Sequence, residues 1–171
     1  MTPLAAQPNE RAKRSLQGTR PELTPRQEAY VAFFRQLLED VRRQYPSITQ
    51  ASKVYPQNWC PFPVGRTGFE IDATFTRDAT LRVDLRFAGD RERNKRAFDA
   101  LVRQRDVLEE ELGYSITWDR QDDKKRSRVF VSRMGSVDDS PEMLAELREW
   151  AVQKVGDFDR VFRPRVQQLE L

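Results

Sequence analysis

The stretch FEIDATFTRDATLRVDLRF, residues 69–87, decides the fold. Apolar residues occupy every second position on both sides of the segment RDAT, and acids, threonines and arginines fill the positions between them. A period of two is typical of a strand with one buried and one wet face, so the two runs predict an antiparallel hairpin. On the wet face we expect acids and arginines to form cross-strand ion pairs.

A second hairpin is predicted in SITWDRQDDKKRSRVFVSR, residues 115–133, where short apolar runs flank a dense cluster of charges. The turn of this hairpin is expected at residues 120–127. Trp118 is in phase with Ile116, so we expect its indole in the core rather than on a ligand.

Three amphipathic helices complete the pattern. The first starts in LTPRQ with Thr24 as its N-cap, and the second spans GDRERNKRAFDALVRQRDVLEEELG. The third starts in DDSPEM and is expected to end or kink at Pro164. The order α-β-β-α-β-β-α predicts an α+β domain in which an antiparallel sheet packs against helices.

The domain is expected to occupy residues 23–171, with an irregular stretch rich in Pro and Gly at 47–68. Residues 1–22 are rich in Pro, Gln and Arg and have no apolar period, so we expect a disordered basic tail there. No apolar run approaches the length of a transmembrane helix and no secretion signal is visible, so we expect a cytoplasmic protein without a membrane partner.

The composition excludes several chemistries. The chain of 171 residues has a net charge of +3, no histidine and one cysteine, Cys60. Zinc sites of the Cys/His type, histidine bases and Ser-His or Cys-His nucleophiles are therefore excluded, as is an internal disulfide. We expect no cofactor and no metal, and we expect Cys60 to be a small buried residue.

Several segments resemble one protein family over about residues 26–169: AFFRQLLEDV, NWCPFPVGRTGFEI, LRVDLRF, ERNKRAFDALVRQRDVLEEELGYSITWDRQDDKKRSRVFV and EWAVQKVGDFDRVFRPRV. They are similar to the family of the domain of unknown function 4268. One departure is that Gly113 precedes the aromatic Tyr114, where the family pattern has the glycine after it. Family members often follow a restriction-type nuclease domain, so the resemblance implies a role beside DNA-processing or defence machinery. It supplies no catalytic residues.

A nuclease of the restriction type would need an acid and a D/E-x-K triplet on neighbouring strands to hold Mg²⁺. Asp122-Asp123-Lys124 matches the triplet, and Asp72 and Asp84 are strand carboxylates. The triplet lies at a predicted hairpin tip that is open to solvent, and both strand aspartates face arginines in the predicted register. We therefore expect no catalytic residues, and a carboxylate-metal nuclease ranks third among the functions considered.

Two basic groups are candidates for nucleic-acid contact, one at the start of the second helix and one along the second hairpin. Basic side chains at a helix N-terminus oppose the helix dipole, which favours a role in binding. Acids interleaved in the hairpin repel phosphate and favour a plain solvated surface or a protein rim, so both interpretations stay open. The candidates are Arg91, Arg93, Lys95, Arg96, Arg120, Lys124, Lys125, Arg126 and Arg128.

The loop before the first hairpin carries candidates for a protein contact. Tyr55, Trp59 and Phe62 would favour a protein partner if they formed one exposed patch. The indole of Trp59 either packs against the domain and anchors this loop, or contacts a ligand.

The sequence thus favours a non-catalytic accessory module of a DNA-processing or defence system. Its expected partners are DNA or RNA, bound weakly and without sequence preference through the basic hairpin, and a nuclease or other defence protein. The alternative is a structural module for protein–protein interaction or oligomerisation that makes no nucleic-acid contact.

Overall fold

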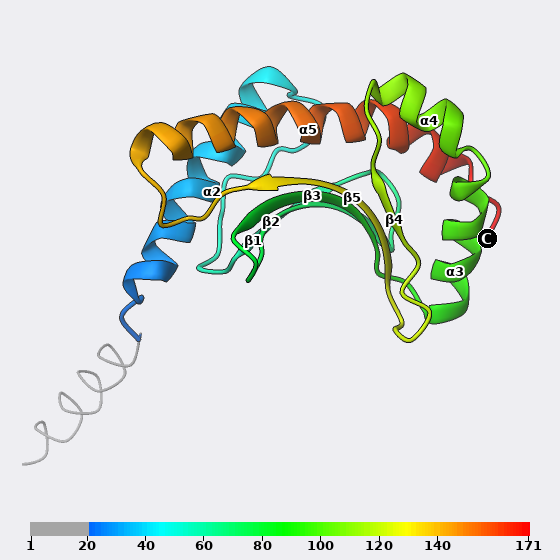
Figure 1. Ribbon diagram of the computed structural model, residues 1–171, viewed down its shortest axis with the longest axis horizontal. Coiled ribbons are helices and arrows are strands. Elements are labelled where there is room, and N and C mark those ends of the chain that lie inside the picture. The colour runs from blue at the N-terminus through cyan, green and yellow to red at the C-terminus, as the bar shows by residue number, and fades with distance from the viewer. Residues whose placement is uncertain (1–20) are drawn as a thin grey trace, which may run out of the picture.

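A five-stranded antiparallel sheet lies at the centre of the fold and is bent into an arch (Figure 1). The computed structural model describes residues 21–171, so the predicted tail falls almost entirely outside the described part. The strands, in spatial order, are β1 (Trp59–Pro63), β2 (Phe69–Phe75), β3 (Thr80–Phe87), β5 (Ser127–Met134) and β4 (Thr117–Asp119).

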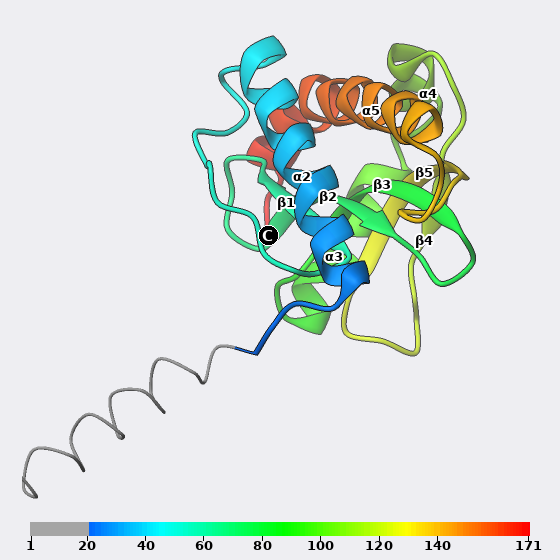
Figure 2. The same ribbon diagram turned by 90° about the vertical axis from the view of Figure 1, so that its left-hand side faces the viewer.

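Helices cover the outer side of the arch. They are α2 (Pro25–Gln44), α3 (Arg91–Val102), α4 (Arg105–Leu112) and α5 (Pro141–Gln168). Helix α5 runs along β2 and β3, and α2 crosses it at one end, as Figures 1 and 2 show. Helix α3 packs on β3 and β5, and α4 packs on α5. Among the described helices, none has the length and apolar character that a membrane crossing requires.

The hairpin β2–β3 divides the molecule into an apolar and a polar side, which confirms the prediction from its period of two. The apolar residues of both strands are buried beneath the helices: Phe69, Ile71, Ala73, Phe75, Leu81, Val83, Leu85 and Phe87. In the register, Asp72 lies opposite Asp84 on the other face. The observed architecture is the predicted α+β class.

Both long helices begin as predicted. The Thr24 side chain accepts a hydrogen bond from the backbone N–H of Gln27, whose own side chain accepts from the N–H of Thr24. In α5, Ser140 is the N-cap and Pro141 takes the first position. Helix α5 does not end at Pro164 but continues to Gln168. Val166 beyond the proline is fully buried, and this packing offsets the lost backbone hydrogen bond.

The prediction of an irregular stretch at 47–68 is wrong for residues 59–63, which form strand β1. Pro61 and Pro63 interrupt the sequence signal, because a proline cannot donate to a sheet ladder. Strand β1 lies at the edge of the sheet, pairs only with β2 and exposes both prolines to solvent. The edge position tolerates residues that a central strand would exclude.

The single helix predicted from Asp90 to Gly113 is in fact two helices, α3 and α4, separated at Arg103 and Gln104. The polar run between Val102 and Val107 supplies no apolar side chain to the core, so nothing holds that turn against the sheet. Asp90 caps α3 and Gly113, with φ of 85°, ends α4, both as predicted.

The second hairpin is present as predicted. Strands β4 and β5 pair in antiparallel register, and the turn lies between them at 120–126. Trp118 packs edge-on against Phe98 of α3, with 6.0 Å between the ring centroids, and donates its indole N–H to Glu109. The indole is therefore half-buried and packs against the edge of the core, as a structural rather than a ligand-facing side chain.

Candidate functional site

The polar face of the sheet, on the inner side of the arch, contains a cleft of about 380 Å³. We call it the inner cleft. Figure 1 shows that no described helix covers this side. Its walls come from β1, β2, β3, β5 and the loops beside them: Asn58, Trp59, Asp72, Thr74, Arg82, Asp84, Arg86, Arg126 and Arg128.

Two buried carboxylates lie opposite each other at the floor of the inner cleft. Asp84 is 1% exposed and Asp72 is 4% exposed. Arg86 donates its Nε to Asp72 Oδ2 at 2.6 Å, and Arg82 Nε lies 3.7 Å from Asp84 Oδ1, which is too far for a hydrogen bond. Burial, together with the charge of the neighbouring Asp72, raises the pKa of Asp84 to about 7. Burial also raises the pKa of Asp72, while Arg86 opposes this change.

The rim of the inner cleft consists of arginines that aromatic rings hold in place. The guanidiniums of Arg82 and Arg128 lie over the ring of Phe130, 5.7 and 5.4 Å from its centroid. The guanidinium of Arg86 lies 5.6 Å from the ring centre of Trp59. Acids also hold two of these arginines in place, since Arg86 pairs with Asp72 and Glu70, and Arg128 pairs with Asp119.

A second cleft, of about 350 Å³, adjoins the inner cleft at the base of the β4–β5 hairpin. We call it the hairpin groove. Arg86 and Arg126 line both clefts, so the two lie side by side. The other residues of the hairpin groove are Ala88, Gly89, Asn94, Lys124 and Lys125.

The structure brings the two predicted basic groups together, and Lys95 is the centre of their contact. Lys95 is 7% exposed, and its three N–H groups are shared among four acceptors at 2.6–2.9 Å, the carbonyls of Arg120, Gln121 and Arg126 and Ser127 Oγ. The side chain thus holds the turn of the hairpin against α3. Its ammonium donors are all engaged within the protein.

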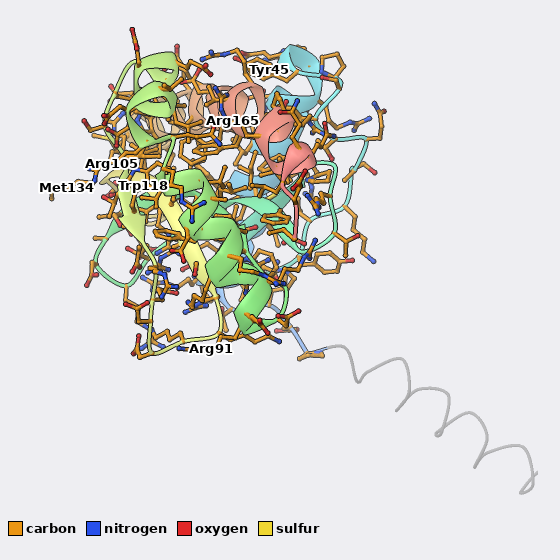
Figure 3. All side chains as sticks on the ribbon, turned by 90° about the vertical axis from the view of Figure 1, so that its right-hand side faces the viewer. Tyr45, Arg91, Arg105, Trp118, Met134 and Arg165 are labelled. Carbon is orange, nitrogen blue, oxygen red and sulfur yellow. The ribbon has the colours of Figure 1, made fainter. Side chains whose placement is uncertain are left out.

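Three further basic candidates are engaged within the protein, namely Arg91, Arg93 and Arg120. Arg91 donates to the carbonyls of Lys124 and Asp122, and Figure 3 shows it beside the tip of that loop. Arg93 donates to the carbonyl of Thr67, and Arg120 pairs with Asp99 and Asp122. The loop carbonyls therefore supply the negative partners that explain basic residues at the start of α3.

The remaining candidates differ in position. Arg96, Lys124, Lys125 and Arg126 are exposed, and the last three line the hairpin groove. Arg128 lies at the rim of the inner cleft and pairs with Asp119 at 3.2 Å. Their contact with nucleic acid stays a prediction.

The possible nuclease triplet lies in solvent. Asp122, Asp123 and Lys124 are all exposed at the hairpin tip, as predicted. Among residues 21–171, no three acids or sulfur ligands come close enough together to hold a metal ion. In the inner cleft, the two aspartates are surrounded by guanidiniums, which do not favour a cation.

The three aromatic candidates for a protein contact do not form one exposed patch. Tyr55 is 53% exposed, but Phe62 is fully buried in the core, which corrects the expectation for that residue. Trp59 is half-buried and forms part of the inner cleft. Cys60 is buried as predicted, and burial raises the pKa of its thiol to about 12, so it is not a reactive thiolate.

Sequence reasoning missed the inner cleft itself. Alternating Asp and Arg along β3 indicated cross-strand pairs, and these are present, but it did not indicate that Asp72 and Asp84 are buried. The sequence held no signal for this burial, because the same alternation is typical of an antiparallel sheet with one packed and one solvated face.

One family model matches the chain. It describes a domain of unknown function, DUF4268, and covers residues 29–166. Among the curated proteins no sequence matches significantly, and none of the solved structures does.

Lys95→Met tests the hairpin contact. The variant removes the ammonium that joins three part-buried carbonyls and the Ser127 hydroxyl, and that hydroxyl can still donate only to the carbonyl of Arg120. We therefore expect the free energy of unfolding to fall by roughly 2–4 kcal/mol in urea titrations. Lys124→Met, at an exposed position of the same loop, should change it by less than about 0.5 kcal/mol. Equal midpoints for the two variants would contradict the assigned role of Lys95.

Asp84→Asn tests the buried carboxyl. The pKa of Asp84 is about 7 in the folded state and 3.8 in an ordinary setting, so between these pH values the folded protein holds a proton that the unfolded chain has lost. The stability of the wild type should therefore fall as pH rises from 4 to 7 and level off above 7. The Asn side chain has no proton to release, so the free energy of unfolding of the variant should exceed that of the wild type by a few kcal/mol at about pH 8.

Urea unfolding at several pH values measures this difference, with Asp78→Asn at an exposed position as the control. The control should show the same offset from the wild type at every pH. An Asp84→Asn protein that is less stable than the wild type above pH 7 would show that the ionised carboxylate is favourable where it lies.

Proposed function

We propose that this chain, which belongs to the family of the domain of unknown function DUF4268, is a non-catalytic nucleic-acid-binding module. The observation that carries the proposal is that the inner cleft and the hairpin groove lie side by side and share Arg86 and Arg126, so that cationic side chains line both. A nucleic-acid strand offers a regular series of phosphates, and a continuous track of guanidinium and ammonium groups is what binds it.

The balance of charge along this track is positive. Four arginines line the inner cleft against two aspartates, and the raised pKa of Asp84 lowers the negative charge there near neutral pH. Lys124 and Lys125 extend the track into the hairpin groove. The acids of the same loop, Asp122 and Asp123, line neither cleft, which reduces the repulsion that interleaved acids would cause.

The geometry of the arginines also suits phosphate. A guanidinium held beside an aromatic ring has lost part of its rotational freedom, so less entropy is lost when it contacts a phosphate. The rings of Trp59 and Phe130 provide this support on both sides of the inner cleft. The resemblance to domains that follow restriction-type nucleases supports an accessory place in a DNA-processing or defence system.

A salt titration tests the proposal. We expect weak binding of duplex DNA, micromolar or poorer, without sequence preference, because phosphates rather than base edges are contacted. If about 3–5 phosphates are neutralised, log K should fall against log salt with a slope of about −3 to −4. Replacing Lys124, Lys125 and Arg126 together by Ala should make the slope shallower, as measured by fluorescence anisotropy.

The matched control is Arg35, Arg42 and Arg43 replaced together by Ala. These residues are exposed on α2, across the sheet from the inner cleft, and their loss removes the same charge. The slope should then stay close to that of the wild type. Equal slopes in both triple variants, or no binding of the wild type at about 50 mM salt, would count against nucleic-acid contact through this track.

The alternative function, a protein-interaction module, has its own observation. An apolar cleft of about 240 Å³ lies beside exposed Tyr55 and is lined by Phe34, Leu38, Val54, Trp59 and Cys60 among others. Small apolar clefts beside an exposed aromatic ring are typical of protein contacts. Self-association that Tyr55→Ala abolishes, together with a failed salt titration, would favour this alternative.

The module is expected to lack nuclease activity. Its acids are either exposed at the hairpin tip or paired with arginines in the inner cleft, so neither set is arranged to hold Mg²⁺. Plasmid DNA incubated with the purified protein and Mg²⁺ or Mn²⁺ should stay intact on a gel. Cleavage that disappears in Asp122→Ala, Lys124→Ala or Asp84→Ala would overturn this expectation and identify the responsible acid.

A further inference from the structure

Asp72 and Asp84 face each other across two central strands of the sheet, and both are buried. They are partners in the β2–β3 register, and their side chains are 4% and 1% exposed. Like charges directly opposite each other in a sheet repel, and burial strengthens the repulsion because little water screens it. A buried carboxyl pair of this kind relieves the repulsion when one of its members holds a proton.

The cations around Asp84 leave part of its charge uncompensated. Arg82 Nε lies 3.7 Å from Asp84 Oδ1 and forms no hydrogen bond with it, and Arg86 is divided between Asp72 and Glu70. Burial and the charge of Asp72 accordingly raise the pKa of Asp84 to about 7. The charged groups on the strands around Asp84 are Asp72 and Glu70 on β2, Arg82 and Arg86 on β3, and, on the β4–β5 hairpin, Arg126 and Arg128, the latter paired with Asp119.

The guanidinium of Arg82 is shared between this carboxyl and any phosphate that enters the inner cleft. An N–H group that donates to a phosphate oxygen is no longer available to a carboxylate, so an ionised Asp84 competes with the ligand for Arg82. One proton on the pair removes this competition and raises the net charge of the residues that line the cleft from +2 to +3. Protonation and phosphate binding therefore favour each other, and the coupling is reciprocal.

We infer that the carboxyl pair of Asp72 and Asp84 makes nucleic-acid binding in the inner cleft dependent on pH, with proton uptake when a phosphate reaches Arg82. The inference rests on the proposed function and adds to it the regulation of the same site. The free protein holds the proton below about pH 7 and loses it above, so the affinity should be highest in mildly acidic solution and fall as pH rises through neutrality. Histidine, the side chain that ordinarily titrates in this range, is absent from the chain.

Fluorescence anisotropy of a labelled duplex tests the inference when pH is varied at constant ionic strength. A unit charge roughly 10 Å from a phosphate changes the affinity about tenfold at an effective dielectric constant of about 20. The wild type should therefore bind about tenfold less tightly at about pH 8.5 than at about pH 6. The phosphodiesters of the duplex keep their charge over this range. An affinity that stays constant or rises with pH, with the duplex bound, would overturn the inference and leave the proposed function standing.

Asp84→Asn removes the titrating carboxyl and keeps the shape of the side chain. At about pH 8.5 this variant should bind about as tightly as the wild type does at about pH 6, and its affinity should change less than about twofold between these pH values. The matched control is Asp106→Asn, an exposed acid on α4, which removes the same charge and should keep the pH dependence of the wild type.

The α-amino group of the chain, which titrates near about pH 8, is common to the wild type and both variants, so the comparison removes its contribution. An Asp84→Asn protein that keeps the pH dependence of the wild type would also overturn the inference. No binding of the duplex by the wild type at any pH would remove both proposals together.

Discussion

The period of two along β2 and β3 is the constraint on which the other features depend. It places every apolar side chain of the central hairpin on one face, and the helices cover that face because it would otherwise be exposed to water. The same alternation places Glu70, Asp72, Arg82, Asp84 and Arg86 on the opposite face. A shift of one residue in the register would exchange the two faces, so the core and the inner cleft are specified together.

The polar face is held at an energetic disadvantage. Two like-charged carboxyls lie opposite each other, and the raised pKa of Asp84 reflects the cost of removing its charge from water. The neighbouring arginines offset only part of this cost, since one oxygen of each aspartate accepts no hydrogen bond within residues 21–171 and Arg82 lies 3.7 Å from that of Asp84. A fold selected for stability alone would place neutral residues here. Buried charges that lower stability are commonest at functional sites.

Much of the fold could be predicted because its signals are local. Thr24 with Gln27, Ser140 with Pro141, and the alternation at 69–87 each identify an element from a few neighbouring residues. Strand β1 and the division between α3 and α4 could not be predicted, because they depend on distant packing that overrides the local signal of Pro61 or of an unbroken helical period. The candidate site divides in the same way. The charges of Arg128 and Asp84 can be read from the sequence, but the burial of Asp84 and the engagement of Lys95 by carbonyls require knowledge of the whole sheet.

The prolines of β1 have a consequence for assembly. Many modular proteins recruit partners by strand addition, in which a foreign segment pairs with the free edge of a sheet. At Pro61 and Pro63, strand β1 has no N–H to offer such a segment, and at the opposite edge β4 is only three residues long. Both borders of the sheet are thus poor templates for a further strand, which also protects the chain against edge-to-edge aggregation. The sheet edges are thus unfavourable sites for a partner strand, which leaves the faces, helices and loops as the surfaces where we expect partners to bind.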